Sequence, residues 1–594
     1  MDYKKIPNLA RMFFDRARER GERPFLWGKC QGRYRPIAWA EAAGLVSRLS
    51  RGLRAFGIER GDRVALVSEN RPEWALADLA IMAAGAIAVP GYVTNTADDH
   101  RHILHNTGAK AAILSSRKLA TNLLAAAHQC PAMRFVVAIE PLGLTQHPGI
   151  DVLAWDEVLQ RGAERPDDVA ALVDSLQRSD ACCIIHTSGT GGMPRGVTLS
   201  HGAIICNCMG AEVLLRQLGL EDEVFLSFLP LSHSYEHAAG LFFPISIGAQ
   251  IYYAEGAETL AANMLEARPT IMTAVPRLYE TLHGRLAGAI KRQGGLKEKL
   301  FAKAVELGTK RYKVPASLGL SERVQDAALD LLVRRKVKAR FGGRLKALVS
   351  GGAPLNLEIG TFFTALGLRL LQGYGQTEAA PVVSCNPPHK VKIHTVGPPL
   401  KDVEVKIAED GELLVRGELV MRGYWNDPEG TAQVLKDGWL HTGDIGRLDE
   451  DGYIQITDRK KDIIVNSGGD NVSPQRVEGF LTLEPEIAQA MVYGDKQPYL
   501  VALIVPRKEF AEEWAAKAGK PPELARLVAE KAFRDAVGQA VERVNAKLSP
   551  IERVRRFALA GEPFSLENNM LTPSLKIRRH VIKVAYGATL DALY

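Results

Sequence analysis

The segment 180–201 (DACCIIHTSGTGGMPRGVTLSH) contains residues suited to holding an anion. The apolar run 181–186 predicts a buried strand, and residues 197–199 predict a second strand. Between them, hydroxyl residues and glycines surround a single guanidinium. Glycines let backbone N–H groups approach an anion closely, and a guanidinium binds phosphate oxygens bidentately. The spacing therefore predicts a phosphate-binding loop that contains Thr187, Ser188, Gly189, Thr190, Gly191, Gly192 and Arg195.

Two better-known phosphate loops do not fit this segment. A Walker loop, GxxxxGK[ST], leads directly into a helix, whereas Pro194 and Arg195 break that spacing and a strand follows. The dinucleotide pattern GxGxxG fails because Gly189 and Gly191 are followed by Pro194. A glycine-rich hairpin without a ligand remains the structural alternative. The next helix should begin near residue 201, with Ser200 as its N-cap.

Two turns after predicted strands are suited to holding a flat ring beside the backbone. They are residues 350–354 (SGGAP) and residues 371–378 (LQGYGQTE). Turns at the carboxyl ends of strands in an open α/β sheet are where ligands bind. Glu378 adds a carboxylate, which is a suitable hard ligand for Mg²⁺ beside phosphate oxygens. Asp444, in GWLHTGD, can accept hydrogen bonds from two hydroxyl groups.

The segment LPLSHSYEH contains a histidine motif with two interpretations. His233, Glu236 and His237 spell H-x-x-E-H, an inverted zinc-protease motif. That motif belongs on a helix, whereas the preceding PLS indicates a loop or strand end, so a zinc site is disfavoured. A buried structural histidine remains the other alternative. A separate polar helix carries three histidines that we interpret as surface residues: His100, His102 and His105.

The elements that position these residues alternate between strand and helix. Residues 63–68 predict a strand, Asn70 caps a helix that Gly85 ends, and residues 86–90 predict the next strand. Similar units recur, which indicates an α/β architecture with largely parallel sheets. Further strands are predicted at 109–114, 135–139, 224–229, 250–253, 270–274, 345–350 and 368–371.

Length and composition predict a soluble protein of more than one domain. The 594 residues exceed a usual domain of about 100–200 residues, and 46% hydrophobic with 24% charged residues is ordinary for a globular enzyme. The net charge of +7 is small for this size. It does not by itself favour nucleic acid, and it allows a weak attraction to anionic membrane surfaces.

Cysteine usage and hydropathy predict a cytoplasmic location. The 7 cysteines include no CxxC pair, which favours reduced structural thiols, and the N-terminus has no apolar signal core. The longest uncharged run, 238–254, is interrupted by Pro244 and Gly248, so we expect no transmembrane segment. Peripheral attachment to the inner face of a membrane and a homodimer both stay open.

The motifs, taken in order, resemble those of the adenylate-forming superfamily, and among its members AMP-forming long-chain fatty acyl-CoA synthetases. The resemblance rests on TSG-T-x-G-x-P-[KR]-G-V, LPLSH-x-x-E, LQGYGQTE, GWLHTGD and ITDRKKD, and ends at LTPSLKIRR. Residues 285–340 form a basic, strongly helical insert that short-chain relatives lack. Three positions depart from the family pattern: Gly191 replaces a second Thr, Arg195 replaces the usual Lys, and Asp470 stands where long-chain relatives often carry Lys.

The resemblance implies a fold and a set of site residues. A large N-terminal domain of stacked, mostly parallel sheets would span residues 1–458, and a small mobile α+β lid would span 459–594. Lys576 and His233 would be catalytic, Lys461 the hinge, Thr187 and Glu378 the Mg²⁺ ligands, and Gly468 and Gly469 part of the CoA tunnel. Besides the phosphate loop, ATP would contact Gly351, Gly352, Ala353, Pro354, Gln372, Gly373, Tyr374, Gly375, Thr377, Asp444 and Arg459.

The implied reaction joins a fatty acid to CoA at the expense of ATP, with Mg²⁺. Acyl-AMP forms first with release of pyrophosphate, and CoA then displaces AMP. Three alternatives remain at this point: a fatty acyl-AMP ligase that serves a carrier protein, an aryl or bile-acid CoA ligase, and a non-catalytic nucleotide-binding protein. The preferred chain length stays open.

Overall fold

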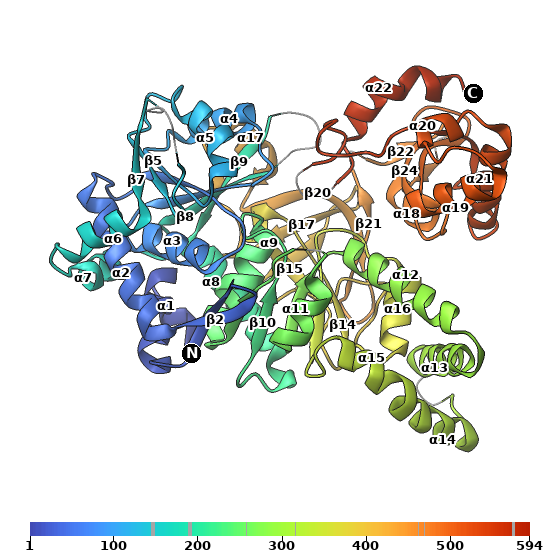
Figure 1. Ribbon diagram of the computed structural model, residues 1–594, viewed down its shortest axis with the longest axis horizontal. Helices are drawn as coiled ribbons and strands as arrows, with labels where there is room; N and C mark the ends of the chain where they lie inside the picture. The colour runs from blue at the N-terminus through green and yellow to red at the C-terminus, as the bar shows by residue number, and fades with distance from the viewer. Residues whose placement is uncertain are drawn as a thin grey trace.

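Two eight-stranded sheets form the base of the large N-terminal part of the molecule (Figure 1). The computed structural model describes residues 1–143, 149–187, 193–256, 258–314, 317–460, 462–468, 470–572 and 576–594. The chain is a mixed α/β protein with a smaller C-terminal part, which Figure 1 shows in orange and red.

The first sheet carries the strand that leads into the phosphate loop. Its order is β18-β9-β8-β4-β3-β5-β6-β7. The strands from β8 to β7 run parallel to one another, β9 is antiparallel to β8, and β18 is antiparallel to β9. The strands are β3 (Arg63–Val67), β4 (Ile87–Gly91), β5 (Ala111–Leu114), β6 (Phe135–Ala138), β7 (Asp151–Ala154), β8 (Ala181–Thr187), β9 (Arg195–Ser200) and β18 (Gly423–Tyr424).

The second sheet carries the two ring-binding turns. Its order is β15-β14-β13-β12-β10-β11-β1-β2; the inner strands are parallel, and the edge strands β15 and β2 are antiparallel to their neighbours. The strands are β1 (Pro24–Cys30), β2 (Arg33–Ala38), β10 (Val224–Ser227), β11 (Gln250–Tyr253), β12 (Ile271–Ala274), β13 (Ala347–Ser350), β14 (Leu370–Gly375) and β15 (Val382–Cys385).

Helix α8 (His201–Leu215) connects the two sheets through their common core. It contacts β9 in the first sheet and β15 in the second. Residues 201–210 of α8 are buried. This helix is mainly apolar on all its sides, as expected for a helix that is covered all round. Its N-cap is Ser200, whose side chain accepts a hydrogen bond from the Ala203 N–H, as the sequence predicts.

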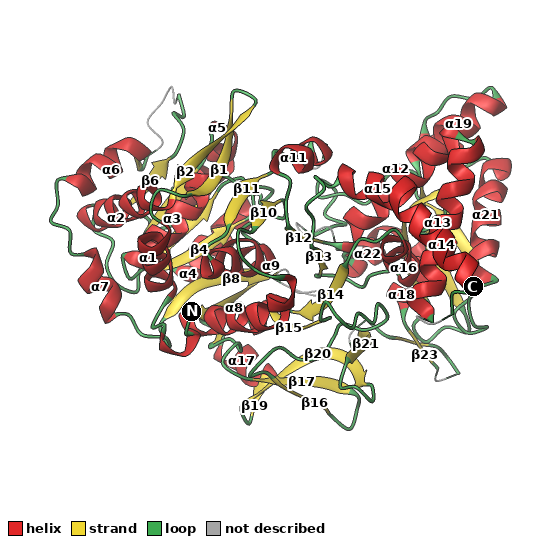
Figure 2. Ribbon diagram, turned by 90° about the horizontal axis from the view of Figure 1, so that it is seen from below, coloured by secondary structure: helices red, strands yellow, loops and turns green. Residues whose placement is uncertain are grey.

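A third sheet and the C-terminal core complete the fold. The third sheet is antiparallel, and Figure 2 shows its strands as a separate layer at the bottom of the view. Its strands are β16 (Glu404–Ile407), β17 (Glu412–Arg416), β19 (Leu435–Lys436), β20 (Trp439–Leu448) and β21 (Ile454–Arg459). The C-terminal part packs α18 (Pro474–Leu481) and α21 (Lys531–Asn545) against the sheet β24 (Ile487–Tyr493), β25 (Leu500–Pro506) and β26 (Val554–Leu559).

The predicted strands are confirmed, with shifts of a few residues at their ends. One predicted cap is wrong. The N-cap of α3 (Pro72–Ala83) is Arg71, whereas the Asn70 side chain donates to Ser227 and to the Leu229 carbonyl and accepts from the Leu231 N–H. Asn70 therefore ties the two sheets together. Helix α3 can begin without an Asn70 cap because its first residue is a proline, whose φ already suits that position.

The basic insert forms a helical arm on the second sheet. It consists of α12 (Pro276–Gln293), α13 (Gly295–Lys313), α14 (Leu320–Leu329), the π-helical turn η4 (Asp330–Arg334) and α15 (Arg335–Arg340). Among the described residues, no helix is both long and apolar enough to cross a membrane.

Candidate active site

A phenol, a carboxylate and a guanidinium meet between the second and third sheets. The Tyr374 hydroxyl at the end of β14 donates to Asp444 Oδ2 at 2.5 Å, and Arg459 Nε donates to Asp444 Oδ1 at 3.0 Å. Asp444 and Arg459 face each other in the β20–β21 register, and Asp444 is only 3% exposed. The structure thus brings together three residues that the sequence predicts to contact ATP.

The two glycine turns lie on adjacent parallel strands, at the ends of β13 and β14. A Cβ on Gly351 would lie 3.1 Å from the ring of Tyr235, so this position has no room for a side chain without movement. The Tyr235 hydroxyl donates to the Val349 carbonyl. Tyr235 therefore supports the 350–354 turn from below, where Gly352, Ala353 and Pro354 are exposed.

The second turn, at residues 372–377, leaves two polar atoms without a partner. Buried atoms Gln372 Oε1 and Gln376 Nε2 have no hydrogen-bond partner among the described residues. A Cβ on Gly373 would lie 2.9 Å from the Ser384 carbonyl oxygen, and one on Gly375 would lie 1.9 Å from that of Pro381, so both positions require glycine. Unsatisfied donors and acceptors on a turn of this kind are suited to a base with polar edges.

The phosphate side of the site is organised around Glu378. Arg195 Nε lies 3.4 Å from Asp427, and its guanidinium carbon lies 5.2 Å from the Tyr424 ring centre. The Tyr424 hydroxyl in turn donates to Glu378 Oε1 at 2.9 Å. Thr187 faces Arg195 in the β8–β9 register. Tyr424 therefore links Arg195, a predicted phosphate ligand, to Glu378, a predicted Mg²⁺ ligand.

Several predicted site residues lie outside the described part of the chain. They are Ser188, Gly189, Thr190, Gly191, Gly192, the hinge Lys461 and Gly469. The other predicted tunnel residue, Gly468, is exposed, and its N–H donates to Asn466 Oδ1.

The LPLSHSYEH segment forms the wall between these two sides. His233 is the N-cap of a short helix, and its Nδ1 accepts from the Tyr235 N–H at 3.1 Å. The Ser234 hydroxyl lies 2.9 Å from the Thr377 hydroxyl, which connects this segment to the second glycine turn. Burial and the nearby Lys576 cation lower the pKa of His233 to about 4, so the imidazole is neutral at pH 7.

The three side chains of the zinc-like motif have separate partners. His237 Nε2 lies 2.9 Å from Asp78, and Thr273 donates to Glu236 at 2.6 Å, while His233 faces its own backbone turn. Among the described residues, no group of three or more His, Cys, Asp or Glu side chains is arranged to hold a metal. The three side chains therefore do not converge on a common metal position.

Lys576 of the C-terminal part lies within electrostatic reach of the same cluster. Desolvation and the Arg459 cation lower the pKa of Lys576 to about 8, while Asp444 and Glu378 act in the opposite direction. Because Lys576 also reaches solvent, screening weakens each of these pairwise effects. Its backbone is fixed by the Thr572 hydroxyl, which accepts from the Lys576 N–H at 3.0 Å.

The donor set fits a magnesium–nucleotide complex. Mg²⁺ is usually held by one or two carboxylates together with phosphate oxygens, and Glu378 and Thr187 offer one carboxylate and one hydroxyl. Arg195 supplies positive charge on the same side, with its side chain 46% exposed and therefore accessible to an anion.

One interpretation of the histidine helix is wrong. His100 is 3% exposed, and burial lowers its pKa to about 4. His102 Nε2 lies 2.8 Å from the Pro194 carbonyl at the end of the phosphate loop. The surface prediction is therefore wrong for His100, while His102 contacts the loop and His105 is exposed as predicted.

The comparisons with known proteins agree with this geometry. The AMP-binding enzyme family matches residues 13–425, and the AMP-binding enzyme C-terminal domain matches residues 461–594. The chain belongs to the AMP-binding enzyme family. A solved structure of an anthranilate CoA ligase, AuaEII, in complex with anthranoyl-AMP has a similar fold, with TM-score 0.72 and 20% identity to this AMP-binding enzyme over 100% of both chains.

Other relatives are similar over nearly their whole length. A long-chain-fatty-acid–CoA ligase, FadD15, of Mycobacterium bovis is 33% identical over 99% of this chain and 97% of that protein. The peroxisomal long chain acyl-CoA synthetase 6 of Arabidopsis thaliana is 31% identical over 95% of this chain and 82% of that protein. A carboxylic acid reductase didomain from Segniliparus rugosus, in complex with AMP, has TM-score 0.76 at 22% identity, covering 99% of this chain and 82% of the other.

Sequence reasoning missed Tyr424 and Tyr235. Tyr424 lies on the two-residue strand β18, which pairs with β9 more than 220 residues earlier in the chain. No local pattern marks such a residue. Tyr235 could have been predicted, because it directly follows His233 and Ser234 in the segment that forms the site wall. A residue of that wall is in a position to support a glycine turn of the site.

Proposed function

We propose that this enzyme activates a long-chain fatty acid with ATP and transfers the acyl group to CoA. In the first half-reaction a carboxylate oxygen attacks the α-phosphorus of ATP, which breaks the bond to pyrophosphate and forms acyl-AMP. In the second, the CoA sulfur attacks the acyl carbon, AMP leaves, and the thiol proton is released. Similarity to long-chain-fatty-acid–CoA ligases over nearly the whole chain supports this reaction.

The observation that carries the proposal is the position of Lys576. A lysine from the C-terminal part shares one electrostatic neighbourhood with Asp444, Glu378 and His233. Charge develops on the attacking carboxylate and the α-phosphate as the first bond forms. A preorganised ammonium at that place stabilises the transition state more than the ground state.

The other residues have distinct proposed roles in the first half-reaction. Asp444, held by Tyr374 and Arg459, would bind the ribose hydroxyls, with Tyr374 beside the adenine. The 351–354 and 372–375 turns would hold the base, and Thr377 and Arg195 the phosphates. Glu378 and Thr187 would hold Mg²⁺, which supplies positive charge to the phosphate oxygens when bound.

The second half-reaction requires Lys576 to leave the site. We propose a boundary between residues 458 and 459, with Lys461 as the hinge about which the lid rotates. Hinges are a few residues that absorb a large φ/ψ change. Rotation would bring Gly468 and Gly469 to the site, where glycines leave room for the pantetheine chain of CoA. His233, neutral at pH 7, would lie beside the acyl carbonyl and the incoming thiol.

A long acyl chain is the proposed substrate class. Relatives at 30–33% identity include several named for long-chain fatty acids, and this chain has the helical insert expected for such relatives. Each further methylene that enters an apolar tunnel adds about 0.8 kcal/mol of binding free energy. Saturated acids of dodecanoate length or longer should therefore be preferred over acetate and benzoate.

An acid screen with both co-substrates tests the proposal. CoA-dependent release of AMP with palmitate is expected, together with palmitate-dependent exchange between pyrophosphate and ATP. Exchange without any CoA-dependent product would instead indicate a fatty acyl-AMP ligase that serves a carrier protein. A profile that peaks at an aromatic acid or at acetate would overturn the long-chain assignment.

A further inference from the structure

The positive charge of the protein is concentrated in the helical arm. Residues 285–340 contain 15 Lys and Arg against 5 Asp and Glu, a net charge of +10, whereas the whole chain has +7. The rest of the chain is therefore slightly acidic. Within this arm, three cations are exposed and form no ion pair with any residue that the structure describes: Lys313, Lys336 and Arg340.

Helix α14 and the turn that follows it expose large apolar side chains on this basic arm. Leu320 is 82% exposed, Val324 72%, Leu331 57% and Leu332 47%. Leu320, Val324 and Leu331 recur at the helical spacing that places them on one face. We call these four residues the α14 patch.

The opposite face of α14 and of the turn η4 that follows it is firmly attached to the body of the protein. Arg334 is fully buried; its guanidinium donates to Asp326 and to the carbonyls of Ala304 and Ala365. Leu329 belongs to the apolar core beneath the arm. The exposure of the α14 patch is therefore a property of a packed helix, and not of a frayed end.

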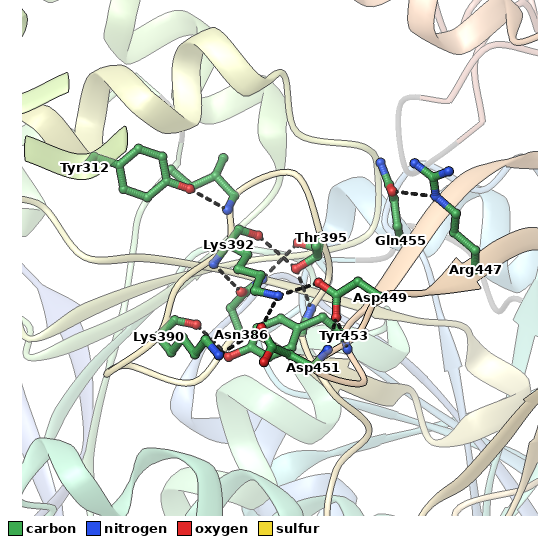
Figure 3. Close-up of polar contacts among 12 residues, drawn as sticks. Tyr312, Asn386, Lys390, Lys392, Thr395, Arg447, Asp449, Asp451, Tyr453 and Gln455 are labelled. Atoms are coloured by element: carbon green, nitrogen blue, oxygen red, sulfur yellow. Dashed lines mark hydrogen bonds and ion pairs between the residues drawn. The ribbon is translucent and has the colours of Figure 1, made fainter. Parts of the chain in front are cut away.

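A second attachment lies at the end of α13. The Tyr312 hydroxyl accepts from the Ile393 N–H at 2.9 Å, and Figure 3 shows this contact beside the network of Asn386, Lys392, Asp449 and Tyr453. Lys392 is held between Asp449 and Asp451. The loop that receives Tyr312 is thus fixed in turn to the third sheet, so the arm is attached both at α13 and at the α14–η4 segment.

We infer that the α14 patch docks on the surface of an anionic lipid bilayer. Exposed apolar side chains and unpaired cations on the same basic arm are the combination by which interfacial helices bind anionic membranes. Figure 1 shows α14 at the outer end of the arm, beyond α13 and α16 (Leu357–Ala365), where a planar surface can reach it. A second copy of the chain is a poor occupant, because a two-fold contact would place two basic arms against each other.

The docking surface follows strand β12 of the second sheet in the chain, after helices α12 and α13. Helix α12 begins two residues after β12 and leads directly into α13. If the enzyme uses long-chain acids, which partition into bilayers, docking through α14 would hold it where its substrate resides. This last step rests on the proposed function, whereas the docking surface rests on charge and exposure alone.

Vesicle binding of the full chain tests the inference. Sedimentation with phosphatidylcholine vesicles that contain a quarter phosphatidylglycerol should capture the wild type at low salt, and capture should weaken with added salt. The variant Leu320→Ser/Val324→Ser/Leu331→Ser should bind at least ~10-fold more weakly, and Lys313→Glu/Lys336→Glu should do the same. Activity on monomeric, detergent-free substrate should be unchanged in both variants.

Matched controls use exposed residues elsewhere. Val584→Ser combined with Leu265→Ser removes side chains that are 88% and 55% exposed outside the patch and should bind as the wild type does. The inference is overturned if the wild type ignores anionic vesicles, if patch variants bind normally, or if they only convert a dimer to monomers. Vesicle binding without ligase activity would contradict the proposed function and would still support this inference.

Discussion

Two clusters of charged residues, one in the helical arm and one in the candidate site, are built in opposite ways. In the arm, Arg334 is fully buried and every nitrogen of its guanidinium donates to a protein oxygen. In the site, Arg195 keeps 46% of its side chain exposed, and Tyr424 engages one oxygen of Glu378. Both clusters contain arginines and carboxylates, so residue type alone does not separate them.

The difference is whether the hydrogen-bonding capacity is used up within the protein. A buried charge whose partners are all internal fixes one packing arrangement, and removing a partner leaves an uncompensated charge. A charge with unused capacity can bind a ligand, and its removal changes affinity or rate more than folding. Substitutions in the arm should therefore change stability, and substitutions in the site should change chemistry.

Asp326→Ala should have the largest effect, and on stability alone. It leaves Arg334 buried without its carboxylate, which costs about 3–5 kcal/mol. Thermal unfolding should shift downward markedly, while activity per folded molecule at 25 °C stays at the wild-type level. The matched control is Glu306→Ala, which breaks the exposed Lys303–Glu306 pair and should cost less than about 1 kcal/mol.

Glu378→Ala should lower activity and leave stability nearly unchanged, the opposite of Asp326→Ala. Loss of the carboxylate proposed to hold Mg²⁺ should lower pyrophosphate exchange by about 10²–10³-fold, the cost of losing a preorganised electrostatic group. The melting temperature should stay close to that of the wild type. Glu429→Ala, an exposed carboxylate near Tyr424, serves as control and should exchange normally. Normal exchange in Glu378→Ala would remove this residue from the metal site.

The pH dependence follows from the lowered pKa of Lys576. The ammonium form is the useful one, and its fraction falls as the pH rises through about 8. The kcat/KM for acyl-AMP formation should thus be flat below pH 8 and fall about 10-fold per unit above it, because this ratio reports the free enzyme. Lys576→Arg keeps its charge at high pH and should lose the decline near pH 8 in its residual activity. An unchanged profile in that variant would assign the decline to another group.

Tyr424→Phe should have the smallest effect. It removes one hydrogen bond to Glu378, worth about 1 kcal/mol, and should raise the KM for ATP about 5-fold. In the double variant with Glu378→Ala the tyrosine substitution should add nothing, since its partner is already gone. Additive losses would show that Tyr424 acts through Arg195 or directly on the phosphates.

The parts of the fold that sequence predicted are those set by local patterns. Apolar β-branched runs marked β8 and β3, and the carboxyl ends of adjacent parallel strands brought the 350–354 and 372–377 turns together. What it missed depends on distant pairing. Tyr424 reaches the site through β18 and β9, and Asn70 bonds to Ser227 rather than to its own helix. His100 is buried beside Gly91 of β4, on a helix that is polar in sequence.

The measurement that tests the account most directly separates the two half-reactions in Lys576→Ala. The ammonium is required only while the carboxylate attacks phosphorus, so this variant should lose acyl-AMP synthesis by at least about 10²-fold. Supplied with acyl-AMP and CoA, it should still form thioester at a rate near that of the wild type. Equal losses in both half-reactions, in a protein with an unchanged melting curve, would contradict a lid that places Lys576 in the site for adenylation alone.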